Sequence, residues 1–567
     1  MRCLPVRDDA LLLELLDLDQ TLALFEALSR DPLPGVGEMI PGARTILVFY
    51  RPTALTPAQI LAWAKGRDLS QRAEAESRLV EVPVRYDGDD LAEVAEILGV
   101  TSEDVVAMHT GSEYLVGFTG FAPGFAYLSG GDPALDVPRR PSPRTHIPAG
   151  AVALAGTFSG VYPRESPGGW QLIGTTDAAM WDLAREQPAL LEPGDRVRFI
   201  DVTDASRGSS TPATSATQHA PVRPLSTAQA ESQSESESHS QSPSQPAGSK
   251  PPAHALVVRS PGMLTLFQDL GRPGYASMGV SASGALDTVS LREANRLVGN
   301  DPGTACLEIA HGGLRLLAQG EHVLAVSGAP TALTVTGADG RARHPLFGRP
   351  FALQSGEELA LGTPQTGVRS YLAVRGGFDL PPVLGSLATD VLAGLGPAPL
   401  AERSVLPVPE AVAGIAPVSM HEVAPLALFD ANGAAGKPTA APADIVLDIV
   451  LGPRTDWFTA DAVETLTGQA WTVTPRSNRV GLRLEGQPLS RVIVDELPSE
   501  GTVSGALQIP ANGQPVLFLA DHPLTGGYPI IGAVTSYHLP IAGQLAAGSK
   551  VRFRPIGGFA EYSEVPS

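Results

Sequence analysis

Thr525-Gly-Gly-Tyr-Pro-Ile-Ile-Gly532 joins a glycine turn to a short apolar run, and Leu545-Ala-Ala-Gly-Ser-Lys-Val-Arg-Phe553 repeats that design further along the chain. The turn Ile509-Pro-Ala-Asn-Gly513 precedes both. The same three phrases occur earlier in the same order: Ile147-Pro-Ala-Gly150, Pro167-Gly-Gly-Trp-Gln-Leu-Ile-Gly174 and Leu191-Glu-Pro-Gly-Asp-Arg-Val-Arg-Phe199. Short apolar runs bounded by glycine turns are typical of β-strands. The repeated order therefore predicts two β units of one plan, either a barrel or a sandwich.

A fainter third echo, at residues 353–361, predicts a third unit of the same kind. Between these units, residues 206–253 form a low-complexity stretch rich in Ser, Gln, Glu and Pro. Its only large aliphatic residues are Val222 and Leu225, too few to offset the entropy of ordering the segment. We therefore expect a disordered linker that joins two modules and lets them dock on each other within one chain.

The first 90 residues differ from the rest because helix and strand patterns alternate there. Residues 21–28 are amphipathic at helical spacing, residues 45–50 read as a buried strand, and Thr56-Pro57 is a helix start. The expected fold class is mainly β with an α/β N-terminal subdomain. The segments predicted are an α/β subdomain, a β barrel, the linker, a β half, a Pro/Ala-rich connection and a second β half: 1–90, 91–205, 206–253, 254–400, 401–443 and 444–567.

Composition excludes several classes of function. A net charge of −20 argues against a nucleic-acid or anionic-membrane partner, because both need a basic face. No apolar run is long enough to cross a bilayer, and two distant cysteines predict no disulfide framework, so we expect a cytoplasmic protein. The four lysines include none in a P-loop and none in a Met-Lys-Met turn of the kind that carries biotin. Covalent biotin on this chain is therefore not expected.

Long ordered phrases carry a family resemblance. Gly117-Phe-Thr-Gly-Phe-Ala-Pro-Gly-Phe-Ala-Tyr-Leu128 resembles the signature of allophanate hydrolase subunit 1 proteins. Ser260-Pro-Gly-Met-Leu-Thr-Leu-Phe-Gln-Asp-Leu-Gly-Arg-Pro-Gly-Tyr275 resembles the opening of allophanate hydrolase subunit 2 proteins, and Tyr371-Leu-Ala-Val-Arg-Gly-Gly377 continues that match. The chain is thus similar to a fusion of the B and C subunits of 5-oxoprolinase, in the carboxyltransferase-domain family. The resemblance implies cyclophilin-like β-barrel domains.

The resemblance also implies an activity. The B and C subunits of 5-oxoprolinase, with a separate A subunit, open the lactam of 5-oxo-L-proline to L-glutamate with ATP hydrolysis, so ATP and Mg²⁺ are implied cofactors. Such a chain would be a hydrolase acting on cyclic amide C–N bonds, active only as a complex. The alternatives are the carboxyltransferase component of a urea carboxylase or urea amidolyase, and a histidine-kinase regulator. The absence of a biotin turn and of an ATP-grasp-sized region favours the 5-oxoprolinase hypothesis.

The turn Gln268-Asp269-Leu-Gly-Arg272 supplies the main catalytic candidates, because it places an amide, a carboxylate and a guanidinium within five residues. The alternative is a structural turn in which Asp269 accepts backbone N–H groups and pairs with Arg272. His109 is a candidate general base, with a capping or packed histidine equally compatible with its position.

Substrate- or phosphate-binding candidates come from three places: a basic cluster beside the Ile147-Pro-Ala-Gly turn, the apolar face of a helix begun by Asp287, and a probable strand on which arginines alternate with apolar residues, with acid nearby in sequence. They are Arg139, Arg144, Asn295, Arg479, Arg483 and Asp521. Solvated loop charges are the alternative for the two arginines before residue 147, and a satisfied core asparagine for Asn295. No two histidines fall at ligand spacing, so no metal ligands are predicted.

Two positions depart from the family pattern. Phe158 stands where relatives often have glutamine, and Leu387 replaces an arginine of a G-S-R-S-T-D phrase. If those side chains touch substrate in relatives, specificity or activity differs here.

Overall fold

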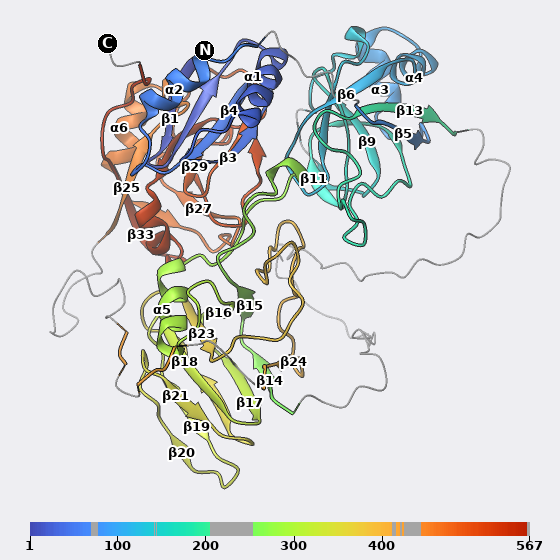
Figure 1. Ribbon diagram of the computed structural model, residues 1–567. Coiled ribbons are helices and arrows are strands. Elements are labelled where there is room, and N and C mark those ends of the chain that lie inside the picture. Colours follow the sequence, from blue (N-terminus) through green and yellow to red (C-terminus); the bar gives the residue numbers. More distant parts are fainter. Residues whose placement is uncertain are drawn as a thin grey trace, which may run out of the picture.

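The computed structural model describes residues 1–69, 77–140, 142, 144–203, 253–410, 416–419, 422–424 and 444–563. The predicted linker lies outside these residues except for Ala253, as does most of the predicted 401–443 connection. The described chain is mostly β, as expected, and forms three lobes (Figure 1). Within this part of the chain, no helix is long and apolar enough to cross a bilayer.

An antiparallel sheet in the order β1-β2-β4-β3 forms the core of the N-terminal subdomain. Its strands are β1 (Arg2–Arg7), β2 (Ala10–Glu14), β3 (Val36–Pro41) and β4 (Thr45–Tyr50). Helices α1 (Leu18–Arg30) and α2 (Pro57–Lys65) pack on one face. Thr56 caps α2 with a full capping box and proline at the first turn, which confirms the helix start predicted there.

A seven-stranded sheet follows, in the order β12-β9-β10-β7-β6-β13-β5. Its strands in chain order are β5 (Leu79–Val84), β6 (Glu113–Thr119), β7 (Ala126–Ser129), β9 (Ala151–Ala155), β10 (Phe158–Val161), β12 (Gln171–Thr175) and β13 (Arg196–Asp201). Arg85 and Thr175 exchange two backbone hydrogen bonds of 2.8 Å, which join the two edges and close the barrel. Helices α3 (Leu91–Leu98) and α4 (Ser102–Gly111) cover it.

Strand β5 corrects the predicted boundary at residue 90. It pairs in parallel with β13, and its Val82 and Val84 are buried in the barrel core. The alternation of Val80, Val82 and Val84 is the reason, since it gives this strand one apolar face that only the barrel covers.

The C-terminal barrel repeats this plan strand for strand. It closes in the order β25-β32-β29-β30-β27-β26-β33. The strands are β25 (Ile445–Leu451), β26 (Trp471–Val473), β27 (Gly481–Glu485), β29 (Ala506–Gln508), β30 (Val516–Phe518), β32 (Ile530–Val534) and β33 (Lys550–Pro555). The last strand pairs in parallel with the first and antiparallel with the second in both barrels. The duplication read from the sequence is therefore confirmed.

The first half of the second module has a different arrangement. A six-stranded sheet, β20-β19-β22-β17-β14-β24, packs on a five-stranded sheet, β15-β16-β23-β18-β21, around one apolar core. The strands are β14 (Ala255–Pro261), β15 (Leu264–Gln268), β16 (Cys306–Ala310), β17 (Leu314–Gln319), β18 (His322–Gly328), β19 (Leu333–Thr336), β20 (Ala342–Arg343), β21 (Phe351–Leu353), β22 (Glu358–Leu361), β23 (Arg369–Val374) and β24 (Val405–Pro407). Helix α5 (Thr288–Val298) packs on β18 and β23.

Two details differ from prediction in this half. The third echo ends in β22, which has only antiparallel partners among the described strands, so it is not the equivalent of the final strand of either barrel. Strand β24 pairs with β14, so this half extends into the segment predicted as a Pro/Ala-rich connection.

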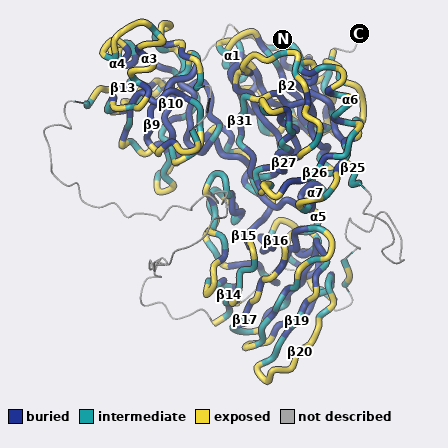
Figure 2. The backbone as a smooth tube through the Cα atoms, turned by 180° about the vertical axis from the view of Figure 1, so that it is seen from behind, coloured by how far each residue is buried: buried dark blue, intermediate teal, exposed yellow. Residues whose placement is uncertain are grey.

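The N-terminal sheet joins the two modules because both of its faces are buried (Figure 2). Leu11, Leu13 and Ile46 pack under α1 and α2, whereas Leu12 and Leu47 face the C-terminal barrel. This explains why its strands are almost continuously apolar rather than alternating. The first module thus docks on the second through this sheet.

Candidate functional site

The segment after β15 lies at a seam where three parts of the chain meet. The Ala276 N–H donates to Glu38 on β3 over 2.8 Å, and the Ala276 carbonyl accepts the Thr119 hydroxyl from β6 over 2.9 Å. The Gly124 N–H donates to the Met278 carbonyl over 2.9 Å. Both parts of the first module therefore hold this segment of the second module in place.

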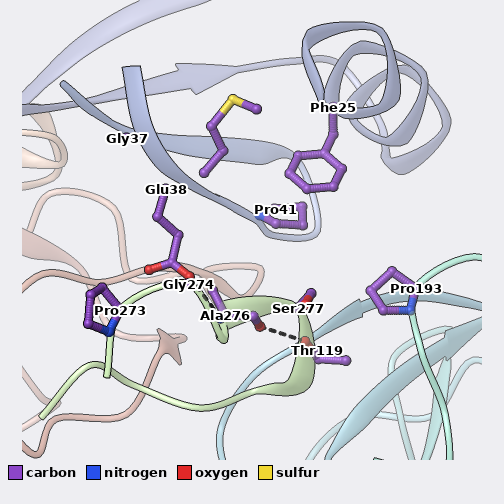
Figure 3. A pocket seen from close by; sticks show the side chains of 11 residues that line it. Phe25, Gly37, Glu38, Pro41, Thr119, Pro193, Pro273, Gly274, Ala276 and Ser277 are labelled. Carbon is purple, nitrogen blue, oxygen red and sulfur yellow. Dashed lines mark hydrogen bonds between the residues drawn. The ribbon is translucent and has the colours of Figure 1, made fainter. Parts of the chain in front are cut away.

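A cleft of about 530 Å³ opens at this seam (Figure 3). Phe25 and Pro41 line it from the N-terminal subdomain, Pro193 from the first barrel, and Pro273 and Ser277 from the second module. Its walls are more apolar than polar, and Glu38 is the only carboxylate among its lining residues.

Behind the seam lies a buried charge network. Arg479 donates to both oxygens of Asp521, over 2.9 and 3.0 Å, and to Glu308. Arg369 lies 3.5 Å from Glu308, and the Tyr371 hydroxyl donates to Glu308 over 2.7 Å. Burial alone would raise the pKa of Glu308, but the two arginines outweigh it and the pKa is lowered. Strands β16 and β23 and the loop before β27 thereby lock the two halves of the second module together.

Asp390 is the acid in this region whose pKa is raised into the physiological range. It is 1% exposed and accepts hydrogen bonds from Ser281 over 3.2 Å and from the Leu392 and Ala393 N–H groups. Burial, and then the charge of Asp521, raise its pKa to about 6. A carboxyl group of this kind exchanges a proton near neutral pH, which is what a general acid or base requires.

Backbone strain also gathers at the seam. Phe121, Ser283 and Leu384 adopt left-handed φ angles of 62°, 54° and 51° without being glycine. Such conformations cost on the order of 1–3 kcal/mol each and are concentrated at functional sites. All three stand in loops that meet at the seam. Phe121 is in the loop that contains Gly124, Ser283 is two residues after Ser281, and Leu384 follows Val383, whose carbonyl accepts from Arg272.

The predicted catalytic turn lies at this site. Asp269 accepts from the Gly271 and Leu387 N–H groups and from the Ser386 hydroxyl, over 2.7–2.8 Å, which is the structural turn considered above. Gln268 donates to the Thr389 carbonyl over 2.8 Å, while its buried Oε1 has no partner among the described residues. Both residues hold the loop that carries Asp390.

Arg272 does not pair with Asp269, contrary to the structural alternative. It is 2% exposed and donates to the backbone carbonyls of Val383 and Ala388. Its buried Nη1 has no partner among the described residues. Burial lowers the pKa of Arg272, with Asp390 acting in the opposite sense.

His109 does not join this site. It is fully buried in the first barrel, where Tyr86 and Ser159 bond its two ring nitrogens over 2.6 and 2.8 Å and Phe199 stacks on it. Burial lowers its pKa to about 3. The prediction of a general base is therefore wrong, and the packed histidine is what the structure has.

The basic cluster before residue 147 is neutralised rather than open to an anion. Arg144 makes a bidentate pair with Asp90 over 2.6 and 2.8 Å, and Arg140 joins the same carboxylate. Arg139 instead reaches across to the second module, where it pairs with Glu496 over 2.7 Å. The binding roles predicted for Arg139 and Arg144 are replaced by structural ones, because carboxylates occupy both guanidinium groups.

Asn295 and Arg483 are also outside the site. Asn295 is buried and bonds the Thr304 carbonyl and Asn300, so it is the satisfied core asparagine. Arg483 is exposed on β27. Arg479 and Asp521 are the two predicted binding residues that the structure places at the centre.

The two departures from the family pattern are packed in apolar surroundings. Phe158 sits edge-on to Phe118 and Tyr127. Leu387 packs against the core of the first half of the second module. Neither side chain belongs to the charged network described above.

Sequence reasoning missed four residues of this region: Arg164, Glu308, Arg369 and Asp390. Glu308 could have been predicted, because a buried carboxylate in the centre of the apolar strand Cys306–Ala310 must be paired with a cation. Arg369 likewise heads the fully buried strand Arg369–Val374. Arg164, which is partly exposed, and Asp390, which is buried, stand in loops, and nothing in their neighbouring residues predicts that they lie close together.

The donors present do not fit a resident Mg²⁺ ion. No group of three or more His, Cys, Asp or Glu side chains that could hold a metal occurs in the described ranges. Asp521 is committed to Arg479, Ser283 and the Val391 N–H, and Asp390 to a hydroxyl and two N–H groups. The arrangement can instead bind an anion through the unpaired Nη1 of Arg272 and exchange a proton at Asp390.

Comparison with known proteins agrees with this architecture. Residues 1–191 match the family model for carboxyltransferase domain subdomains C and D, and residues 278–555 match the model for subdomains A and B. The crystal structure of TTHA0988 superposes with a TM-score of 0.76 at 35% identity, covering 96% of this chain and 99% of that one.

The curated relatives divide between the modules. The 5-oxoprolinase B subunit of Escherichia coli O157:H7 is 42% identical over 208 residues, covering 35% of this chain and 95% of that protein. The 5-oxoprolinase C subunit of Escherichia coli K12 is 34% identical over 297 residues, covering 52% and 88%. Urea amidolyase of Lachancea kluyveri is 30% identical over 332 residues, 53% of this chain but 17% of that protein. The chain therefore belongs to the carboxyltransferase-domain family, as a fusion of two modules that resemble the B and C subunits of 5-oxoprolinase.

Proposed function

We propose that this chain supplies the B and C parts of an ATP-dependent 5-oxoprolinase, which opens 5-oxo-L-proline to L-glutamate together with a separate A subunit. The observation that carries the proposal is the joining of two modules, each similar to nearly a whole 5-oxoprolinase subunit, at one buried site. That site contains arginines and an acid, Asp390, whose pKa is raised to about 6.

The chemistry requires such groups. A lactam is a poor electrophile because its amide is resonance-stabilised. Transfer of the ATP γ-phosphoryl group to the lactam oxygen activates the ring carbon; a first water adds there and the C–N bond breaks to give an acyl phosphate, which a second water hydrolyses, giving glutamate, ADP and phosphate. Arginines stabilise the anionic groups during these steps, and burial excludes bulk water. Because the carboxylates here do not fit resident Mg²⁺, the ion enters with the nucleotide.

Asp390 has a defined task in this proposal. When the C–N bond breaks, the ring nitrogen must receive a proton, and Asp390 can deliver one near neutral pH. The Ser281 hydroxyl and the 392–393 backbone N–H groups hold its carboxyl group in one orientation.

The test is reconstitution. The purified chain is mixed with its A subunit, and 5-oxoproline-dependent release of ADP and glutamate is measured. Coupled formation of both, absent with either protein alone, is the expected result. A folded, verified complex without turnover contradicts the proposal.

The second candidate is transfer of CO₂ from carboxybiotin to urea or a similar amide, favoured by the 30% identity to urea amidolyase. It predicts carboxylation that depends on a biotinylated carrier protein and is independent of the A subunit. Adding and omitting such a carrier in the same assay separates the two. Binding to a histidine kinase without any turnover would instead support a regulatory role.

A further inference from the structure

Arg272 has an unused hydrogen-bonding group beside the seam. Two of its nitrogens, Nε and Nη2, are held by the Val383 and Ala388 carbonyls, which fixes the plane of the guanidinium group. Its Nη1 is buried and bonds no other described residue. A buried, unpaired donor on a cation costs free energy, so such a group indicates a missing acceptor.

Arg164 approaches the same loop from the first module. It follows β10 and lies against the turn from Asp390 to Leu395, where its Nη1 is 3.0 Å from the position of a Cβ at Gly394. Among the described residues its side chain makes no hydrogen bond or ion pair. Burial lowers the pKa of Arg164, while the charge of Asp390 acts in the opposite sense.

Other arginines nearby differ from these two. Arg144 and Arg479 each hold a carboxylate with two nitrogens. Asp390 attracts both Arg164 and Arg272, but its oxygens are committed to Ser281 and to the 392–393 backbone N–H groups. Two guanidinium groups, one from each module, therefore lie against the residue 388–394 segment with donors that bond no other described residue.

We propose that Arg164 and Arg272 form a small oxyanion subsite that is complete only when the two modules are docked. Its ligand is a carboxylate or phosphoryl group, because guanidinium donors match the planar or tetrahedral oxygens of these anions. If the proposed function holds, the carboxylate of 5-oxoproline and a transferred phosphoryl group are the two sources; the lactam then lies next to Asp390. The subsite itself rests on the geometry of this chain and not on turnover.

Binding to the intact chain, without the A subunit, tests the subsite. Calorimetry and thermal shift are measured with three probes: 5-oxo-L-proline, inorganic phosphate, and 2-pyrrolidinone, which has the same ring without the carboxylate. We expect 5-oxoproline or phosphate to bind and 2-pyrrolidinone to fail to compete. Binding of 5-oxoproline identifies a carboxylate subsite, and binding of phosphate alone identifies a phosphoryl subsite.

Two variants and a control make the test specific. Arg164→Gln removes no hydrogen bond within the described structure, so it should fold, and Arg272→Lys keeps the charge but loses the fork of donors. Each should weaken anion binding by about tenfold or more. Arg483→Gln, an exposed arginine on β27, should leave binding unchanged.

Several outcomes overturn the proposal. These are the absence of anion binding up to about 10 mM, equal competition by 2-pyrrolidinone, and unchanged binding in both Arg164→Gln and Arg272→Lys. The failure of the proposed function is distinguishable. Loss of turnover with retained, arginine-dependent binding removes the 5-oxoprolinase proposal alone, whereas turnover with both kcat and kcat/KM unchanged in Arg164→Gln removes the subsite alone.

Discussion

Asp390 lies in a buried region together with other carboxylates, and their negative charge makes its own ionisation unfavourable. Asp521 is fully buried and stays paired with Arg479, so its charge remains close to Asp390. Asp287, the N-cap of α5, is also buried, and burial raises its pKa as well. The cost of ionisation therefore falls on the two acids that lack a paired arginine, Asp287 and Asp390, and both have a raised pKa.

The substitution Asp390→Asn should reduce the pH dependence of stability. Folding raises the pKa of Asp390 from 3.8 to about 6, so the folded state binds this proton more tightly than the unfolded state. The associated stability is complete below about pH 4 and is lost as the pH rises through 6, a loss of about 2 kcal/mol between pH 4 and pH 8. Urea unfolding at the two pH values should show this loss in the wild type and not in the variant.

The control for that measurement is Asp461→Asn, at an exposed position in helix α6 (Ala460–Gly468). It should keep the wild-type pH dependence. Equal pH dependence in Asp390→Asn and the wild type would show that Asp390 is not the raised acid.

Glu308→Gln should strongly destabilise the second module. The substitution leaves Arg369 and Arg479 buried without their shared carboxylate, and breaking a buried pair costs roughly 3–5 kcal/mol. Glu358→Gln is the matched control, because Glu358 pairs with Arg315 at the surface and should cost under about 1 kcal/mol. Urea midpoints measure both, and similar shifts in the two variants would contradict the prediction.

Among the residues of the candidate site, the sequence predicted those whose neighbouring residues form a recognisable pattern. Arg479 was predicted because arginines alternate with apolar residues there, and Asp521 as an acid nearby in sequence; both lie at the centre of the site. His109 failed because a capped helix leading into a strand is the same pattern for a catalytic and a packed histidine. Arg164 could not be found, since its environment is made by a loop more than 200 residues away.

At the scale of elements, the duplicated barrel was readable because each repeated phrase is one turn and one strand. The phrase at 191–199 becomes the turn and strand β13, and that at 545–553 becomes the turn and strand β33. Strand β5 was missed because it pairs in parallel with β13 more than 100 residues later, and no local turn marks that pairing. Periodicity thus predicts strands well and their non-local partners poorly.

The loop after β6 is the element that seats the first module on the second, and Gly120→Ala should disturb it. A Cβ at Gly120 would lie 2.2 Å from Thr525 Oγ1 and 2.6 Å from its Cγ2. Such overpacking costs about 1–3 kcal/mol. Thr525→Ala removes both atoms, so the double variant should recover part of that loss, and a double-mutant cycle of unfolding free energies measures the coupling.

The control is Gly111→Ala, where no atom lies within 4 Å of the added Cβ. Its effect should stay within about 0.5 kcal/mol. Additive effects of Gly120→Ala and Thr525→Ala would show that the two residues are not in contact.

At the scale of the whole molecule, the N-terminal sheet is the interface that two separate subunits would have to form. One face packs on its own helices and the other on the barrel of the second module. The sequence predicted one buried strand of this sheet, at residues 45–50, but could not say what covers its second face, because an apolar strand specifies burial and not its partner.

A buried ion-pair network fixes this docking, so Arg454→Met should weaken the association of the modules. Arg454 donates to Glu500 over 2.7 and 3.0 Å within the second module and to Glu14 on β2 over 2.7 Å. Its loss leaves Glu500, which is 1% exposed, and Glu14 without this cation.

With a specific protease site placed in the predicted linker and cleaved after folding, the wild-type halves should stay together on dilution, whereas the variant should associate about a hundredfold more weakly. Analytical ultracentrifugation over a dilution series measures this, with Arg552→Met, which removes the partner of Asp444 within the barrel, as the control. Separation of the control to the same extent, or an intact Arg454→Met complex, would mean that apolar packing alone holds the modules together.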